Sequence, residues 1–81
     1  MTGTIPLSFL SPGSDAVVNN IRAGEGLTRH LVAMGIRPES RLTVICADRG
    51  SLIVSVAGSR YALSKGMAMK ILVEKTGVKV Q

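Results

Sequence analysis

One junction between a helical pattern and a strand pattern does most to limit the folds open to this chain. Leu27, Leu31 and Met34 recur at the spacing of one face of a short amphipathic helix. Gly35 follows at the position where a helix commonly turns left-handed, which a residue without a side chain does most easily. Pro38 then makes continuation impossible, because its ring clashes with a preceding helical turn. The pattern therefore predicts a short helix that ends abruptly.

The residues after this stop predict an immediate change to a strand. Ile36 falls where a Schellman-type ending would bring it into contact with Leu31. From residue 41 the apolar period becomes two, which places Leu42, Val44 and Cys46 on the inner face of a strand. Cys46 is the single cysteine, so no internal disulfide can form, and its register predicts a buried structural thiol.

The other apolar segments predict short strands separated by tight turns. Pro12–Gly13 is typical of a type II turn, because proline fixes the first corner and glycine accepts the positive φ of the second. Asn19–Asn20 interrupts the alternation of the strand that follows, which predicts a β-bulge. The expected strands cover residues 15–21, 41–46, 51–56, 60–64 and 71–74, and Lys65–Lys70 is expected to form a single helical or 3₁₀ turn.

These elements predict an all-β chain with one short helix. Five short strands are best protected if the sheet closes, because closure removes the unpaired edges of an open sheet. We therefore expect a single domain over residues 1–81, built as a small five-stranded barrel with the helix inserted between the first and second strands. The helix would cap one open end. The core is expected to span about residues 5–74, with 75–81 as a frayed tail.

The composition limits the classes of partner. Ten Lys and Arg stand against five Asp and Glu, a formal net charge of +5, and they are scattered without a basic run. This balance suits a negatively charged partner, or simply a solvated surface. The N-terminus has no charged region ahead of its few apolar residues, and no apolar run reaches the ~20 residues that cross a bilayer. We expect a soluble cytoplasmic protein without direct membrane insertion.

Catalytic and metal-binding residues are sparse. The one histidine, His30, lies on the helix face away from the apolar stripe, and the five acidic residues show no ligand spacing. Cys46 lacks an evident partner for nucleophilic chemistry. We therefore predict no enzyme, no catalytic residue and no cofactor. His30 is the one weak metal candidate, and an adventitious divalent metal at His30 with Glu25 stays open.

Nucleic-acid binding is the alternative that the charge leaves open. A small basic barrel can bind RNA or DNA through phosphate contacts. The bases would also need stacking side chains, and Phe9 and Tyr61 are the only aromatic residues. No phosphate-binding glycine motif occurs between a strand and a helix. We therefore expect no nucleic-acid partner.

Four stretches in order resemble the FeoA family, the small cytoplasmic proteins of the bacterial ferrous-iron transport system. The segment LTRHLVAMGIRPESRLTVI has the family's helix ending in Met-Gly-Ile before a proline and an alternating strand. LSFLSPGSDA, from Leu7 to Ala16, resembles its opening. Tyr61–Leu63 resembles the segment before its final turn, and Ala68, Ile71 and Val73 match its closing pattern. The resemblance runs from about Ile5 to Glu74.

The resemblance implies an SH3-like barrel that is not an enzyme. Such a protein contacts the cytoplasmic side of the membrane GTPase-permease of the same system, FeoB, which would place this chain at the inner face of the membrane through its partner. The same module occurs in iron-dependent repressors, so a stand-alone relative of that module is a further alternative.

Three positions depart from the family pattern. Glu39 replaces a common glycine, which predicts a turn without positive φ; the loop Ala47–Ser51 is shorter than usual; and Met67 replaces a common acidic residue.

We expect the polar face of the helix and the turn after it to contact the partner. The predicted contact residues are Arg29, His30, Arg37 and Glu39, with Met34 and Ile36 in support. The other reading is that the helix only plugs the barrel. Structural roles are predicted for Pro12, Gly13, Leu31, Gly35 and Pro38. Self-association stays open, since no residue decides it.

Overall fold

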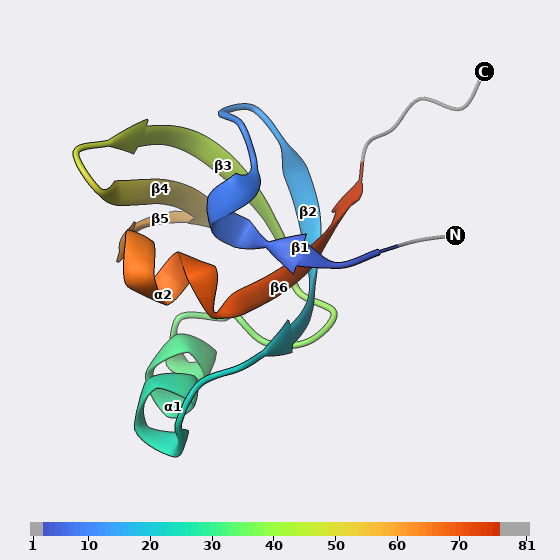
Figure 1. Ribbon diagram of the computed structural model, residues 1–81, viewed down its shortest axis with the longest axis vertical. Helices are drawn as coiled ribbons and strands as arrows, with labels where there is room; N and C mark the ends of the chain where they lie inside the picture. The colour runs from blue at the N-terminus through green and yellow to red at the C-terminus, as the bar shows by residue number, and fades with distance from the viewer. Residues whose placement is uncertain (1–2, 77–81) are drawn as a thin grey trace.

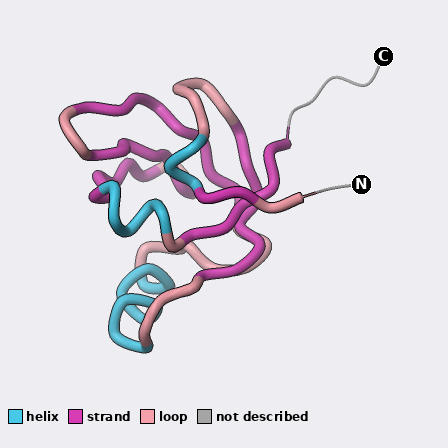
Figure 2. The backbone as a smooth tube through the Cα atoms, in the orientation of Figure 1, coloured by secondary structure: helices cyan, strands magenta, loops and turns pink. Residues whose placement is uncertain are grey.

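A six-stranded antiparallel sheet curls around the core in the computed structural model, which describes residues 3–76 (Figure 1). The strands follow the order β1-β6-β2-β3-β4-β5 across the sheet. The elements along the chain are β1 (Ile5–Pro6), the 3₁₀ helix η1 (Leu7–Phe9), β2 (Asp15–Ile21), α1 (Glu25–Ala33), β3 (Arg41–Asp48), β4 (Ser51–Val56), β5 (Ser59–Ser64), α2 (Lys65–Met69) and β6 (Ile71–Thr76). Figure 2 shows how strand dominates the backbone, as the all-β prediction required.

The sheet has one strand more than the sequence predicted. Ile5 and Pro6 pair with Val73 and Leu72 of β6, which adds β1 beside the last strand. Two residues are too few to show an alternating pattern, so only the pairing with β6 reveals this strand. At its other end β6 continues past Glu74 to Thr76, which pairs with Asp15. Residues 75 and 76 therefore belong to β6, contrary to the expectation of a frayed tail there, and residues 77–81 lie outside the described part of the chain.

The predicted turns form for the expected reasons. The Ser14 N–H donates to the Ser11 carbonyl at 3.1 Å across Pro12 and Gly13, with φ +89° at Gly13, so the type II turn is confirmed. The two-residue turn between β3 and β4 has Arg49 and Gly50 both at positive φ, the type I′ geometry that suits a hairpin.

The core is built from aliphatic side chains, and the strands contribute to it through alternating buried residues. Buried side chains alternate along β4, where Leu52, Val54 and Val56 point inward. The helix α1 contributes Leu31, which is fully buried, while Leu27 and Met34 pack half-buried against the core. α1 begins at Glu25, ahead of Leu27, the first residue of the predicted apolar stripe. In the chain α1 lies between β2 and β3, which are the first two strands that the sequence predicted. In Figure 1 it lies at one end of the molecule.

Two bulges set which side chains face the core. The register between β2 and β6 shifts between Val18 and Asn20, which confirms the first bulge and returns Ile21 to the core. A second shift lies between Val44 and Cys46 on β3, where the strand advances two residues for one on β4. Cys46 therefore pairs with Ile53 and is exposed. The prediction of a buried thiol is wrong because a strict alternation cannot anticipate the extra residue.

The last predicted helical turn is also present. α2 follows β5 without a break, and the Ser64 hydroxyl caps it by accepting from the Met67 N–H at 3.2 Å. α2 packs against the 3₁₀ helix η1 and against the strands β4, β5 and β6.

Candidate functional site: the helix-stop surface

The stop of α1 has the complete hydrogen bonding of a Schellman motif. The Ile36 N–H donates to the Leu31 carbonyl and the Gly35 N–H donates to the Val32 carbonyl, both at 2.9 Å. Gly35 has φ +88°, and a Cβ built on it would lie 3.3 Å from Cγ1 of Val56. The predicted stop is confirmed. Glycine is required here both for conformation and for the close approach of β4.

The turn after the stop is a second type II turn, at Arg37–Ser40. The Ser40 N–H donates to the Arg37 carbonyl at 2.9 Å, Pro38 occupies the first corner, and Glu39 takes φ +76° at the second. The prediction that Glu39 gives a turn without positive φ is wrong. Its N–H donates to the Val18 carbonyl at 2.7 Å, so β2 fixes the turn whichever residue occupies the corner.

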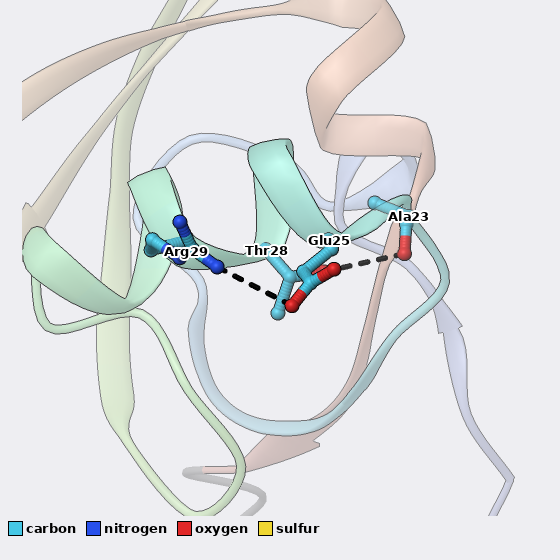
Figure 3. A network of polar contacts seen from close by, with 4 residues as sticks. All are labelled: Ala23, Glu25, Thr28 and Arg29. Atoms are coloured by element: carbon cyan, nitrogen blue, oxygen red, sulfur yellow. Dashed lines mark hydrogen bonds and ion pairs between the residues drawn. The ribbon is translucent and has the colours of Figure 1, made fainter.

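The face of α1 carries a short polar network near its start (Figure 3). Nη2 of Arg29 lies 3.3 Å from Oε2 of Glu25, one helical turn earlier, and both side chains are largely exposed. Oγ1 of Thr28 donates to the Ala23 carbonyl at 3.3 Å, just ahead of the helix. An exposed pair of this kind adds little stability and exchanges easily for a partner's groups. Arg29 is therefore oriented but available.

The six predicted contact residues differ in how far they reach the surface. Arg29, His30, Arg37 and Glu39 are exposed, and Met34 is half-buried. Ile36 is fully buried in the core, so it anchors the stop beneath the surface and has no atoms free for a partner. We call the exposed set, with the hollow described next, the helix-stop surface.

A shallow hollow of about 380 Å³ joins the stop to the sheet. It is lined by Gly35, Arg37, Ser40, Arg41, Val56 and Ala57. Arg41 and Ala57 were not among the predicted contact residues, because they lie on β3 and after β4 and only the fold brings them to the stop. Among residues 3–76 the one ion pair is Arg29–Glu25, so Arg37 and Arg41 give the hollow an unneutralised positive charge.

A wider hollow of about 510 Å³ shares Arg41 and Ala57 with the first. On its wall Oγ1 of Thr43 donates to Oδ1 of Asp15 at 2.7 Å, between the paired strands β3 and β2. Asp15 is thus committed to a neighbour on the sheet. The helix-stop surface therefore continues onto β3 as a polar surface that includes Arg41.

Residues 3–76 do not bring possible metal-ligating side chains together. They contain no group of three or more His, Cys, Asp and Glu side chains that could hold a metal ion. The one histidine and the one cysteine belong to different elements: His30 lies on α1 and Cys46 lies on β3. No helix in the described chain has the length and apolar character to span a membrane.

Comparisons with known proteins agree on one family. A family model described as "FeoA domain" matches residues 5–75. The chain is 45% identical over 69 residues to a protein of Methanocaldococcus jannaschii named "Putative Fe(2+) transport protein A", which covers 85% of this chain and 84% of that protein. A crystal structure described as an iron uptake regulatory protein (FeoA) superimposes with a TM-score of 0.85 at 36% identity, over 91% of this chain and 99% of that one.

A likeness to metal-dependent repressors is also found, but it covers only part of them. A manganese-dependent transcriptional repressor in complex with manganese has a TM-score of 0.82 at 27% identity. The match covers 90% of this chain and 37% of the repressor. The shared part is an SH3-like module, which agrees with the fold expected from the sequence.

Proposed function

Because the chain belongs to the FeoA family, we propose that it is a non-enzymatic accessory protein of ferrous-iron uptake that contacts the cytoplasmic part of a FeoB-type GTPase-permease. The family model spans residues 5–75, and the 45%-identical relative carries Fe(2+) transport in its name. The partner follows from the family resemblance. On this proposal the protein is cytoplasmic, reaches the inner face of the membrane through its partner, and needs no resident cofactor.

We assign the contact to the helix-stop surface, and the backbone of Glu39 is the observation that carries this assignment. Glu39 holds φ +76° in an exposed turn, where a side chain costs about 1–2 kcal/mol that glycine would avoid. Strain of this kind concentrates at functional positions. Glu39 and Arg37 line one hollow, in a turn that β2 holds in place through Val18.

The charge of this surface indicates the chemistry of the partner. Arg37 and Arg41 line one hollow. Arg29 lies on the adjoining helix α1, where its one ion-pair partner is the exposed Glu25. A partner surface rich in carboxylates complements the three arginines, and a basic group would meet Glu39. Such complementarity steers association and makes it weaken with salt.

The test is a binding titration between this chain and the soluble cytoplasmic domain of the permease. Arg29→Glu with Arg37→Glu should weaken binding by about tenfold or more, since each reversal replaces an attraction by a repulsion. Lys70→Glu with Lys75→Glu makes the same change of net charge at exposed residues outside the surface and should have a much smaller effect.

Two results would count against the proposal in different ways. Equal affinity for the wild type and the Arg29/Arg37 variant would place the contact elsewhere on the molecule. Absence of binding to the permease domain, with tight salt-sensitive binding to RNA or DNA, would favour the nucleic-acid alternative instead. Circular dichroism of each variant checks that the fold is retained.

A further inference from the structure

A separate cleft of about 300 Å³ lies between η1, the β3–β4 turn and α2. Its floor is apolar, formed by Leu10, Leu52 and Ala68, whose exposed fractions are 7%, 5% and 0%. The Lys65 N–H donates to the Gly50 carbonyl at 2.8 Å, which ties the start of α2 to the turn. We call this site the η1–α2 cleft. Its volume is at the small end of the range for ligand sites.

The two charged side chains that line this cleft are both cationic. Arg49 comes from the β3–β4 turn and Lys65 from the first residue of α2, and both are exposed. Neither forms an ion pair within the part of the chain that the structure describes. Asp48 precedes Arg49 in sequence but does not line the cleft. An apolar floor below two unneutralised cations favours an apolar group with carboxylates beside it.

Exposed apolar side chains stand on the two elements that border the cleft. Phe9 of η1 is 71% exposed and Met69 of α2 is 56% exposed, and each is next in sequence to a lining residue. They are two of the three large apolar side chains exposed between residues 3 and 76, the third being Val32 on α1. Because η1 and α2 pack against each other, both exposed side chains belong to elements that border the cleft.

We propose that the η1–α2 cleft binds an acidic peptide segment of a partner protein. One apolar side chain of the segment rests on Leu10, Leu52 and Ala68, and its carboxylates meet Arg49 and Lys65. Neighbouring apolar side chains of the segment cover Phe9 and Met69. The site shares no residue with the helix-stop surface, so it holds whether or not that surface binds the permease.

A peptide fits these features better than a lipid surface or a nucleic acid. Membrane recognition through headgroups uses a cluster of about four to eight basic residues, and the cleft presents two. Single-stranded nucleic acid would need several stacking rings, and Phe9 is the one aromatic side chain beside the cleft.

The experiment follows the amide resonances of the ¹⁵N-labelled full chain during titration with a synthetic peptide. The probe has a Leu-Phe pair flanked on both sides by Glu and Asp. It is added to about 1 mM, where a complex with a millimolar Kd is half formed. Saturable shifts centred on Arg49, Gly50, Lys65 and Ala68 are expected. A peptide with Ala-Ala in place of Leu-Phe, and one with Lys in place of the acids, should both shift them far less.

Variants test the residues assigned to the cleft. Arg49→Glu with Lys65→Glu should weaken peptide binding by about tenfold or more. Arg60→Glu with Lys75→Glu is the matched control, because it changes the net charge equally at exposed residues outside the cleft. Phe9→Ser should weaken binding by about threefold without loss of folding, since Phe9 is exposed.

Several results would overturn the proposal. These are an absence of saturable shifts, shifts centred on α1, or equal binding by the Arg49/Lys65 variant and its control. Stronger binding to phosphatidylserine vesicles or to oligothymidylate than to the peptide would also overturn it. Binding of the permease domain is measured separately, so a failure here is distinguishable from a failure of the proposed function.

Discussion

The chain contains two type II turns with the same hydrogen bond and different residues at the same corner. Ser11–Ser14 closes at 3.1 Å with Gly13 at φ +89°, and Arg37–Ser40 closes at 2.9 Å with Glu39 at φ +76°. Both have proline at the first corner and serine at the last. The first turn meets the backbone requirement with glycine, whereas the second meets it with a charged side chain. The first turn, between η1 and β2, has no side chain at this corner, whereas the second exposes a carboxylate there.

Gly35 extends this comparison to a third position with positive φ. Unlike Gly13, it also has a neighbouring side chain, Val56, close to where a Cβ would lie. Gly35→Ala should lower the free energy of unfolding by about 2 kcal/mol, from the positive φ and from the 3.3 Å approach to Val56. Denaturant unfolding measures the loss. Gly26→Ala is the control: Gly26 lies inside α1 with open space around it, so alanine should instead raise stability by about 0.5–1 kcal/mol. Equal effects of the two changes would contradict this account.

In the first turn, Ser11–Ser14, backbone strain can be introduced without a steric clash. Gly13→Ala places a Cβ at φ +89° with nothing within 4 Å, so only backbone strain should appear, about 1 kcal/mol of lost stability. Urea unfolding of this variant beside Gly35→Ala isolates the steric contribution of Val56. A loss at Gly13 equal to that at Gly35 would mean that the contact with β4 contributes nothing.

The second turn can be relaxed, with the smallest change in stability. Glu39→Gly should raise the free energy of unfolding by about 0.5–1 kcal/mol, because glycine adopts φ +76° without strain but loses more conformational entropy on folding. Thermal and urea unfolding measure the gain. Glu39→Gln keeps the strain and removes the charge, so its stability should stay near that of the wild type.

Binding by the same two variants connects the strain to function. If Glu39 contacts the permease through its carboxylate, Glu39→Gly and Glu39→Gln should both weaken binding, although only the first is stabilised. A stabilised glycine variant that binds as well as the wild type would show that the strain has no role in this contact.

Local chemistry made much of the fold predictable. Gly35 and Pro38 end the helix through conformational rules that act within a few residues, and Pro12–Gly13 forms its turn for the same reason. The alternation in β4 set the core face correctly because no bulge interrupts it. Two residues of the candidate surface could be proposed from the sequence for the same reason, since Arg29 and Arg37 flank the helix stop in the chain.

The residues that prediction missed depend on contacts between distant segments. Arg41 and Ala57 join the helix-stop surface through the packing of β3 and β4 against the stop, and nothing near them in sequence marks them. The η1–α2 cleft likewise gathers residues from Leu10 to Ala68. Its two cations are far apart in the chain, so a search for basic runs could not find them.

The sequence by itself determined where the chain must turn, stop and alternate, and through its order of motifs it indicated the family. Those properties depend on φ preferences, missing donors and periodicity, which act over a few residues. Only the tertiary structure decided the φ of Glu39, the exposure of Cys46 and the pairing of β1. Each depends on hydrogen bonds to another strand: from Glu39 to Val18, from β3 to β4 across a bulge, and from Ile5 to its partner on β6. Such bonds form only when distant parts of the chain meet.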